Sequence, residues 1–420
     1  MDKNIVILGA GFGGLRAATK LGKKVKRGKL GNHKVILIDK NDYHTYTPTL
    51  YEISATSKEA ANYMDLKSVN TFPVKQLIGK YPIDFIKASV VKIDTQKGDI
   101  HLSDGRHIPY DHLVIALGAQ SNFFNIKGLE ENALELKTFT DAVKIRDAIF
   151  AAIISAEKNE EISIVIGGAG ATGVEVAGEI QKWVSQLKSE GYNCKTKTII
   201  VDRGETVLSK FDKRIIKKAT RRLKKLGTNI VTKETIESAT ETRVNLKSGK
   251  TIPFNVLIWT GGVKANQLTN TIPFKTDKIN RFEVINQMLC ISEDSDLHIK
   301  GKIYGIGDIV CTFNSKTGKS VPGVARAAIS QGSVVAKNIA NDIRGKKHIT
   351  YRAINYPYII AIGGKYAIAK IGPVVISGFF GWILKGLVEL NYLASIMPKD
   401  RAFKIWLKGM KIFIQNDRLG

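Results

Sequence analysis

Cysteine, acidic side chains and long apolar runs are all scarce in this chain of 420 residues. It has three cysteines, Cys194, Cys290 and Cys311, and their spacing fits neither a metal cluster nor a redox pair. An odd number of thiols also argues against a disulfide framework, so the sequence favours a reducing compartment. Because the N-terminus runs directly into an apolar stretch, we expect no signal peptide.

No stretch is apolar for long enough to cross a bilayer. The most apolar one, residues 371–384, lies between Lys370 and Lys385. It falls short of the roughly 20 residues that a spanning helix needs. We therefore predict no transmembrane helix.

Acidic residues are outnumbered, with 38 Asp and Glu against 64 Lys and Arg and a net charge of +26. Such an excess favours an anionic partner, such as a membrane surface, a nucleic acid or an acidic protein. A general bias toward Lys, Asn and Ile contributes to it. No recognisable nucleic-acid-binding module surrounds the basic residues, so we predict no nucleic-acid partner.

The chain is long enough for two or three domains, and its first forty residues carry the clearest motif. An apolar run of strand type at 5–8 leads into the spacing G-x-G-x-x-G, then a helical pattern, then a second strand at 35–38 that ends in an acid. The residues of the motif are Gly9, Gly11, Gly14 and Asp39. This order predicts a dinucleotide site, with phosphates at the helix N-terminus and a ribose at the acid.

The same motif occurs a second time in the middle of the chain. A strand at 162–166 precedes Gly168, Gly170 and Gly173, and the strand at 198–201 ends in Asp202. Two copies imply two dinucleotides, or one dinucleotide and a duplicated shell. The acid at Asp202 favours NAD over NADP because it would repel a 2′-phosphate, while the adjacent Arg203 counts the other way.

Further elements follow from periodicity and turn signals. We predict β-structure over 84–115 with a turn at 104–105, a helix over 137–158 and a basic helix over 212–225 with a solvated charged face. Strands are expected at 255–262 and 302–308, and a long helix after Pro322. Asp308, just past its strand, could hold a ribityl chain or merely form a turn.

The C-terminal tail predicts an amphipathic helix after Pro398. One face carries apolar residues at spacings of three and four, and another carries cations; they are Phe403, Trp406, Leu407, Met410 and Phe413, and Arg401, Lys404, Lys408 and Lys411. This pattern is typical of a helix lying in an anionic membrane interface. The alternative is a helix docked on its own domain or on a second subunit.

Seven segments together resemble the type II NADH dehydrogenases, single-subunit NADH:quinone oxidoreductases of the two-dinucleotide-domain flavoprotein superfamily. They are GAGFGGLRAA at 9–18, YHTYTPTLYEIS at 43–54, LVIALGA at 113–119, GGAGATGVEVAGEI at 167–180, IWTGGV at 258–263, IYGIGD at 303–308 and ARAAISQG at 325–332. SGFFGWILKGLVEL at 377–390 also resembles the family's apolar C-terminal segment.

The resemblance implies an α/β fold with two Rossmann-like domains, the FAD domain being split by an inserted NAD domain. The expected FAD domain is 1–125 plus 286–345, the NAD domain 126–285, and a membrane-association region 346–420. The implied reaction passes a hydride from NADH to FAD and two electrons to a membrane quinone, without proton pumping. The implied location is peripheral, on the cytoplasmic face of the cell membrane, and a homodimer is left open.

The resemblance also implies residue roles. FAD would be held by Gly9, Gly11, Gly13, Gly14, Asp39, Ala116, Gly118, Asp308, Ala325 and Arg326, and the 44–51 segment would pass near the flavin. NADH would be held by Gly168, Gly170, Gly173, Asp202 and Gly261. The implied catalytic residues are Glu175, near the nicotinamide, and Gln331, at the quinone pocket. No metal is implied.

Three positions depart from the family pattern, and all bear on the electron acceptor. Arg326 stands where the family usually has glutamine, Glu52 also replaces a glutamine, and Glu389 replaces a common histidine. Alternatives are a sulfide:quinone oxidoreductase or a disulfide reductase, which need cysteines near the flavin, a ferredoxin or rubredoxin reductase, and a non-catalytic redox sensor.

Overall fold

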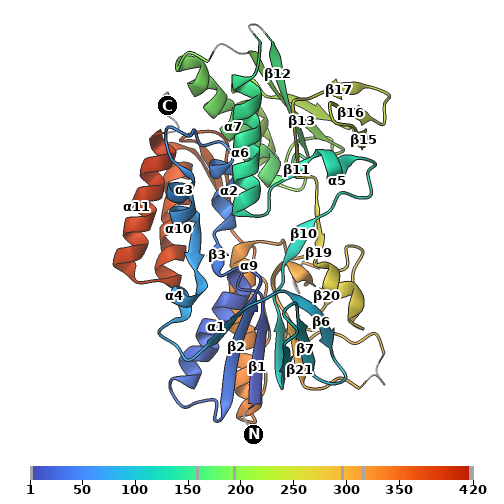
Figure 1. The fold of residues 1–420 in the computed structure, drawn as a ribbon, viewed down its shortest axis with the longest axis vertical. Helices are drawn as coiled ribbons and strands as arrows, with labels where there is room; N and C mark the ends of the chain where they lie inside the picture. Colours follow the sequence, from blue (N-terminus) through green and yellow to red (C-terminus); the bar gives the residue numbers. More distant parts are fainter. Residues whose placement is uncertain are drawn as a thin grey trace. The chain divides into compact units, whose positions relative to one another are not determined.

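The computed structural model describes residues 3–157, 160–192, 195–294, 298–314, 317–318 and 320–415. Their contacts gather into two units, which Figure 1 shows as a ribbon. Unit 1 consists of Met1–His44, Phe72–Gln120 and Val263–Tyr356. Unit 2 consists of Thr45–Thr71, Ser121–Gly262 and Pro357–Gly420.

Unit 1 is built on a five-stranded parallel sheet. Its order is β21 (Lys302–Gly305), β9 (His112–Ile115), β1 (Lys3–Leu8), β2 (His33–Asp39) and β5 (Asp84–Lys87). The central strand is apolar along Ile5–Leu8 and wholly buried, as expected for a parallel sheet covered on both faces. The helices α1 (Phe12–Val25) and α9 (Ala325–Ile343) lie together, because Gly332 has no side chain to strike the carbonyl of Gly13.

A second sheet of unit 1 is antiparallel. It contains β6 (Val90–Asp94), β7 (Asp99–Leu102) and β8 (His107–Pro109). The turn between β7 and β8 contains Gly105 at φ +82°, which confirms the predicted turn. Shorter elements here are α4 (Val74–Ile78), β20 (Phe282–Glu283), η2 (Gln267–Thr271), η3 (Gly307–Ile309) and β22 (Val310–Cys311).

Unit 2 contains the other five-stranded parallel sheet. Its order is β11 (Leu134–Glu135), β18 (Val256–Trp259), β12 (Glu161–Gly167), β13 (Lys195–Asp202) and β14 (Asn229–Thr232). The helices α6 (Phe139–Ile154) and α7 (Ala171–Ser189) pack on it, and α6 begins with a capping box between Thr138 and Asp141. The predicted α/β fold with two parallel sheets is confirmed.

The basic helix α8 (Lys213–Lys225) also belongs to unit 2. It buries Ile215, Ala219 and Leu223, and most of its cations face solvent, as predicted. Arg222 differs, because its guanidinium donates to the carbonyls of Ile362 and Gly363. Part of the charge therefore anchors the C-terminal segment. Shorter elements of unit 2 are α5 (Leu129–Asn132), β15 (Ile236–Ala239), β16 (Arg243–Leu246) and β17 (Thr251–Pro253). The strand β19 (Val263–Ala265) belongs to unit 1, and the chain passes from one unit to the other within β3 (Tyr43–Thr45), β4 (Thr71–Pro73) and β10 (Ala119–Ser121).

The C-terminal segment forms an antiparallel sheet and two helices. The strands are β23 (Tyr358–Ala361), β24 (Ala367–Ile371) and β25 (Val374–Gly378), and the helices are α10 (Phe379–Ile396) and α11 (Lys399–Gln415). Unit 2 also contains the short helices of the segment 45–71, which are η1 (Thr47–Thr49), α2 (Leu50–Ile53) and α3 (Tyr63–Asn70). The apolar stretch 371–384 is divided between β25 and α10. Among the described helices, none has the length and apolar character to cross a membrane.

The predicted amphipathic helix is present as α11, but its apolar face is divided. Trp406, Met410 and Phe413 are partly buried, whereas Phe403 and Leu407 are half exposed, at 50% and 52%. The division arises because α11 packs on α10 and α3, which cover only one side of the apolar stripe.

Candidate functional site

In the first glycine turn, in unit 1, Gly9, Gly13 and Gly14 are closely packed and Gly11 is open. Gly9 has φ +99°, and a Cβ there would lie 2.5 Å from the carbonyl oxygen of Ala116. A Cβ on Gly14 would overlap the carbonyl oxygen of Gly9, and one on Gly13 would press on Ile306. At Gly11 nothing lies within 4 Å. Backbone N–H groups at the start of α1 are therefore accessible to an anionic ligand at Gly11.

Asp39, at the end of β2, joins that strand to the turn. Its Oδ2 accepts a hydrogen bond from the N–H of Ala10 (2.6 Å) and its Oδ1 one from Asn41 (2.7 Å). Burial raises the pKa of Asp39, and these two backbone hydrogen bonds oppose the shift. The carboxylate keeps lone pairs for a ribose hydroxyl.

His44 also lies beside this turn, and its individual position was not predicted. Its Nδ1 is 2.9 Å from the carbonyl oxygen of Ala10, and its ring packs edge-on to Phe12. Burial lowers the pKa of His44 to about 4, so the ring is neutral at neutral pH.

The other predicted residues of unit 1 lie at strand and helix ends. Asp308 is on η3, directly after β21, and Gly118 follows β9 at φ +70° with open space around it. Ala325 and Arg326 open α9, whose N-terminus has no side-chain cap, and Arg326 is exposed. The free N–H groups there suit an anionic or polar ligand atom.

Gln331 lies buried on α9, and its position explains the shape of the turn that bears Asp308. Its Oε1 accepts a hydrogen bond from the N–H of Gly307 (2.7 Å), and its Nε2 lies 3.5 Å from Thr312 Oγ1. The side chain thus holds the Gly307–Asp308 turn in place.

The second glycine turn, in unit 2, repeats the first. Gly168 has φ +106°, and a Cβ there would lie 2.6 Å from the Cα of Gly261. A Cβ on Gly173 would overlap the carbonyl oxygen of Gly168, whereas at Gly170 nothing lies within 4 Å. This turn is also packed at its ends and accessible at its middle glycine.

Asp202 matches Asp39 in its hydrogen bonds. Its Oδ2 accepts from the N–H of Ala169 and its Oδ1 from that of Gly204, both at 2.6 Å. The neighbouring Arg203 stacks its guanidinium 5.9 Å from the ring centre of Phe124. Arg203 is the cation that counted against a preference for NAD, and this contact orients its side chain toward Phe124.

A cluster of buried charges lies in unit 2, where α2, α7 and α10 meet. Its members are Glu52, Glu175, Glu179, Lys385 and Glu389, and we call it the charged cluster. Lys385 Nζ lies 2.6 Å from Glu52 Oε2, and the two side chains are 16% and 8% exposed. The cluster holds four carboxyl groups and one ammonium.

Two of the crowded carboxyl groups, Glu175 and Glu389, have pKa values raised toward neutral pH. Burial raises the pKa of Glu175 to about 8, opposed by a backbone hydrogen bond at Ala361 and by Lys385 and aided by Glu52 and Glu179. Burial likewise raises the pKa of Glu389 to about 7. For Lys385, burial lowers the pKa, but Glu52 and Glu389 outweigh it and the net shift is upward. Lys385 therefore stays charged while Glu175 and Glu389 exchange protons near pH 7 to 8.

Lys385 is the residue that sequence reasoning missed. Glu52 and Glu389, noted as separate departures, both act on it. In the sequence, Lys385 stands four residues before Glu389, and this spacing places the two side chains on the same face of a helix. It could have indicated that they interact. Tyr51 adds a buried hydroxyl that has no hydrogen-bond partner among the described residues, and Lys385 Nζ lies 5.5 Å from its ring centre.

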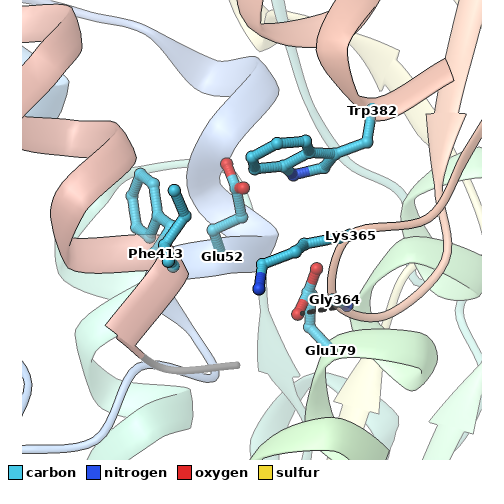
Figure 2. A pocket seen from close by; sticks show the side chains of 7 residues that line it. Glu52, Glu179, Gly364, Lys365, Trp382 and Phe413 are labelled. Carbon is cyan, nitrogen blue, oxygen red and sulfur yellow. Dashed lines mark hydrogen bonds between the residues drawn. The ribbon is translucent and has the colours of Figure 1, made fainter. Parts of the chain in front are cut away.

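A pocket opens beside the charged cluster, and Figure 2 shows it. Glu52 and Glu179 line it together with an indole, a phenyl ring and a lysine; the full lining is Glu52, Glu179, Gly364, Lys365, Trp382, Phe413 and Ile414. Glu179 Oε2 accepts a hydrogen bond from the N–H of Gly364 (3.4 Å). The enclosed space is about the size of one water molecule, and its polar groups could hold such a water beside the charged cluster.

Apolar side chains are exposed on α10 and α11 of the same unit. Those at least 37% exposed are Phe379, Phe380, Ile383, Leu387 and Val388 on α10, and Phe403, Leu407 and Ile414 on α11. Lys404 and Lys411 are exposed on α11. We call this set the apolar surface, and a surface of this kind marks an interaction site.

The described cysteines are poor nucleophiles. Burial raises the pKa of both Cys290 and Cys311, so neither thiol ionises readily. Cys194 lies outside the described residues. The raised thiol pKa values of Cys290 and Cys311 count against a sulfide:quinone oxidoreductase and a disulfide reductase, which need reactive cysteines near the flavin.

Comparison with known proteins places the chain in a family of oxidoreductases. Residues 3–332 match the family model described as pyridine nucleotide-disulphide oxidoreductase. The type II NADH:quinone oxidoreductase of Haemophilus influenzae is 30% identical over 371 residues, covering 80% of each chain. That of Staphylococcus saprophyticus is 27% identical over 417 residues, covering 96% of this chain and 98% of the relative.

Solved structures share the fold. NDH2 from Plasmodium falciparum in complex with NADH matches with a TM-score of 0.81 at 18% identity, over 98% of each chain. The sulfide:quinone oxidoreductase of Aquifex aeolicus matches with a TM-score of 0.75 at 17% identity, over 95% of this chain and 92% of that one.

Proposed function

The chain belongs to the pyridine nucleotide-disulphide oxidoreductase family and, within it, to the type II NADH:quinone oxidoreductases, and we propose that it transfers electrons from NADH through FAD to a membrane quinone. The observation that carries this proposal is the pair of matching glycine turns, one on each parallel sheet. Two such turns give one place for a resident cofactor and one for a visiting nucleotide.

FAD fits the turn of unit 1, which is accessible at Gly11 and closed elsewhere. We assign its binding to the predicted set Gly9, Gly11, Gly13, Gly14, Asp39, Ala116, Gly118, Asp308, Ala325 and Arg326. Bound FAD would supply the two-electron redox chemistry that links donor and acceptor. The residues of this turn would orient the bound FAD. His44 is neutral at neutral pH and adds no charge beside the turn. Gln331 acts in this proposal as a positioning residue, through Gly307.

NADH is the substrate of the second turn. Gly168, Gly170, Gly173 and Gly261 shape the phosphate site, and Asp202 accepts hydrogen bonds from the ribose and repels a 2′-phosphate. Glu175 lies on α7, two residues after Gly173, and would border the nicotinamide. The inserted NAD domain spans 126–285 in this proposal, between the two FAD-domain segments 1–125 and 286–345.

Reduction of a quinone to a quinol needs two protons as well as two electrons. The charged cluster can hold and release protons near neutral pH, because Glu175 and Glu389 have pKa values of about 8 and 7. Lys385 offsets part of the negative charge of the cluster as they ionise. We therefore assign proton supply for the acceptor to this cluster.

An anaerobic experiment tests the reaction. The yellow protein, purified without added nucleotide, is mixed with NADH and its flavin absorbance should bleach; a soluble quinone should then restore it. If NADH does not bleach the absorbance, the enzyme proposal is wrong. If bleaching occurs but quinone does not restore the colour, the acceptor is not a quinone.

We propose the apolar surface as the membrane contact, and with it the peripheral location on the cytoplasmic face that the family resemblance implies. Insertion of its exposed rings between headgroups would bury apolar area, while Lys404 and Lys411 face anionic lipid. Quinones are lipid-soluble, so this contact would bring the enzyme to its acceptor.

Vesicle sedimentation tests this contact. The variant Phe403→Gln with Leu407→Gln should bind vesicles of anionic phospholipid at least roughly tenfold more weakly, because two apolar side chains that would insert between headgroups are lost without a change of charge. Val91→Gln, at an exposed apolar position of unit 1, is the matched control and should bind like the parent. Equal binding of both variants would contradict the assignment.

A further inference from the structure

Three metal-ligating side chains meet on the antiparallel sheet of unit 1, within the segment 90–109. Asp99 and His101 lie two residues apart on β7 and so face the same side of the sheet. Ile100 and Leu102 alternate with them and are buried on the other side. His107 on β8 pairs directly with His101 in the antiparallel register. The fold itself therefore brings two imidazoles and a carboxylate together.

Their separations are close to those of ligands on one ion. His107 Nδ1 lies 2.8 Å and His101 Nε2 3.5 Å from the same oxygen, Asp99 Oδ2. The ligand atoms of all three lie within 4.8 Å of one another, and the two imidazole ring centres are 4.1 Å apart. Tetrahedral ligands 2.0–2.2 Å from an ion lie roughly 3.3 Å from each other. Small side-chain rotations would close this geometry.

The chemical types of the three ligand atoms indicate which metal ions would bind. Two imidazole nitrogens and one carboxylate oxygen suit Zn²⁺ and its first-row neighbours, whereas Ca²⁺ and Mg²⁺ prefer oxygen ligands alone. The His107 side chain is 58% exposed, so an ion has a direct path from solvent and water can fill the remaining position.

The nearest cations are engaged by their own carboxylates. Lys92 pairs with His101 across β6 and β7, but its ammonium lies 3.9 Å from Asp94 Oδ2. Arg106, next to His107, donates to Asp104 Oδ2 at 2.6 Å. Their charge is thus partly compensated beside the three ligands.

We propose that Asp99, His101 and His107 form a binding site for a divalent transition metal of the zinc class. The ion would tie β7 to β8 directly beside the turn at Gly105 and so stabilise this sheet of unit 1. The site lies on a different sheet from the first glycine turn and does not depend on the proposed reaction.

The test is calorimetric titration of tag-free, flavin-loaded protein, stripped of metals by dialysis against a chelator, with zinc chloride. We expect one saturable site per chain, and binding at least roughly tenfold weaker in His107→Ala and in Asp99→Asn, since loss of even an outer partner costs that much. His298→Ala, an exposed histidine outside the cluster, is the matched control and should bind zinc as the parent does. Calcium chloride should give no saturable heat.

Thermal unfolding provides a second readout. Zinc should raise the unfolding midpoint of the parent and of His298→Ala, but not that of His107→Ala. Absence of a saturable zinc site, or equal zinc binding by the parent and by His107→Ala, would overturn the proposal and leave an ordinary hydrogen-bonded His–Asp–His cluster.

Discussion

The helices that follow the two glycine turns, α1 and α7, begin alike and then differ in charge. Two and six residues after the last glycine of the motif, α1 has Arg16 and Lys20 and α7 has Glu175 and Glu179. The cations are partly or fully exposed, whereas both acids enter the charged cluster. The same glycine turn is thus followed by cations open to solvent in unit 1 and by acids in the charged cluster in unit 2.

The partners of the two helices explain this difference. α1 packs through Gly13 on α9, which leaves no room for side chains between them. α7 packs through Gly178 on the turn at Gly363, where a Cβ would lie 2.7 Å from the backbone nitrogen. The C-terminal segment thereby reaches α7 and contributes Lys385 and Glu389 to it.

The largest effects are expected from the glycines at which a Cβ meets backbone. Gly14→Ala and Gly173→Ala each place a methyl group on a carbonyl oxygen, so each should cost about 1–3 kcal/mol of folding stability or more. Gly14→Ala should lose flavin, and Gly173→Ala should keep flavin but resist reduction by NADH. Flavin absorbance and anaerobic reduction measure this. Loss of flavin in Gly173→Ala alone would reverse the assignment of the two turns.

Removal of the cation from the charged cluster should leave nucleotide binding in place and act on stability, where it should cost more than either glycine variant. Lys385→Met leaves Glu52 and Glu389 without a counter-charge and should lower the free energy of unfolding by about 3–5 kcal/mol. Denaturant unfolding measures it, and Lys404→Met, at an exposed position of α11, should stay within about 0.5 kcal/mol of the parent. Adding Glu52→Gln to Lys385→Met should recover part of the loss. A Lys385→Met protein as stable as its control would show that the ion pair is not needed.

Nucleotide preference should respond to Asp202. Asp202→Ala removes the acceptor that would bind a ribose and repel a 2′-phosphate, so the ratio of kcat/KM for NADH over NADPH should fall by about 1.5–3 kcal/mol, or roughly ten- to a hundredfold. Glu205→Ala, an 82% exposed neighbour, should leave the ratio unchanged. An unaltered ratio in Asp202→Ala would remove this residue from the ribose site.

The smallest expected effect is on the pH dependence of stability. The native pKa of Glu175, about 8, lies above its usual value of 4.5, so the folded state binds the extra proton between these values. Its contribution to stability is therefore full below about pH 4.5 and is lost as the pH rises through 8. Glu175→Gln should flatten the curve of unfolding free energy between pH 5 and 8 by on the order of 1–3 kcal/mol. Glu237→Gln, at an exposed site, should not; identical curves for both would contradict the shift.

The sequence was informative where function depends on local spacing. The two turns, their strands and the acids Asp39 and Asp202 could be predicted, because the motif fixes backbone conformation over a few residues. The pairing of Glu52 with Lys385 could not, since 333 residues separate them and only tertiary folding joins them. Nor could periodicity tell which half of the α11 stripe packs inward, because a helix looks equally apolar to a protein core and to a membrane.

Substitution of the two accessible glycines tests the division of labour most directly. Gly11 and Gly170 have φ −70° with extended ψ and nothing within 4 Å of a Cβ, so alanine should leave each fold intact and obstruct only a ligand. The measurement is an anaerobic absorbance titration with NADH of the parent, Gly11→Ala and Gly170→Ala. Gly11→Ala should purify with less flavin, and Gly170→Ala should carry full flavin but need at least roughly tenfold more NADH to bleach it, a loss of about 1.4 kcal/mol in binding. The reverse pattern, or two variants that titrate like the parent, would contradict a resident flavin in the first turn and a visiting NADH in the second.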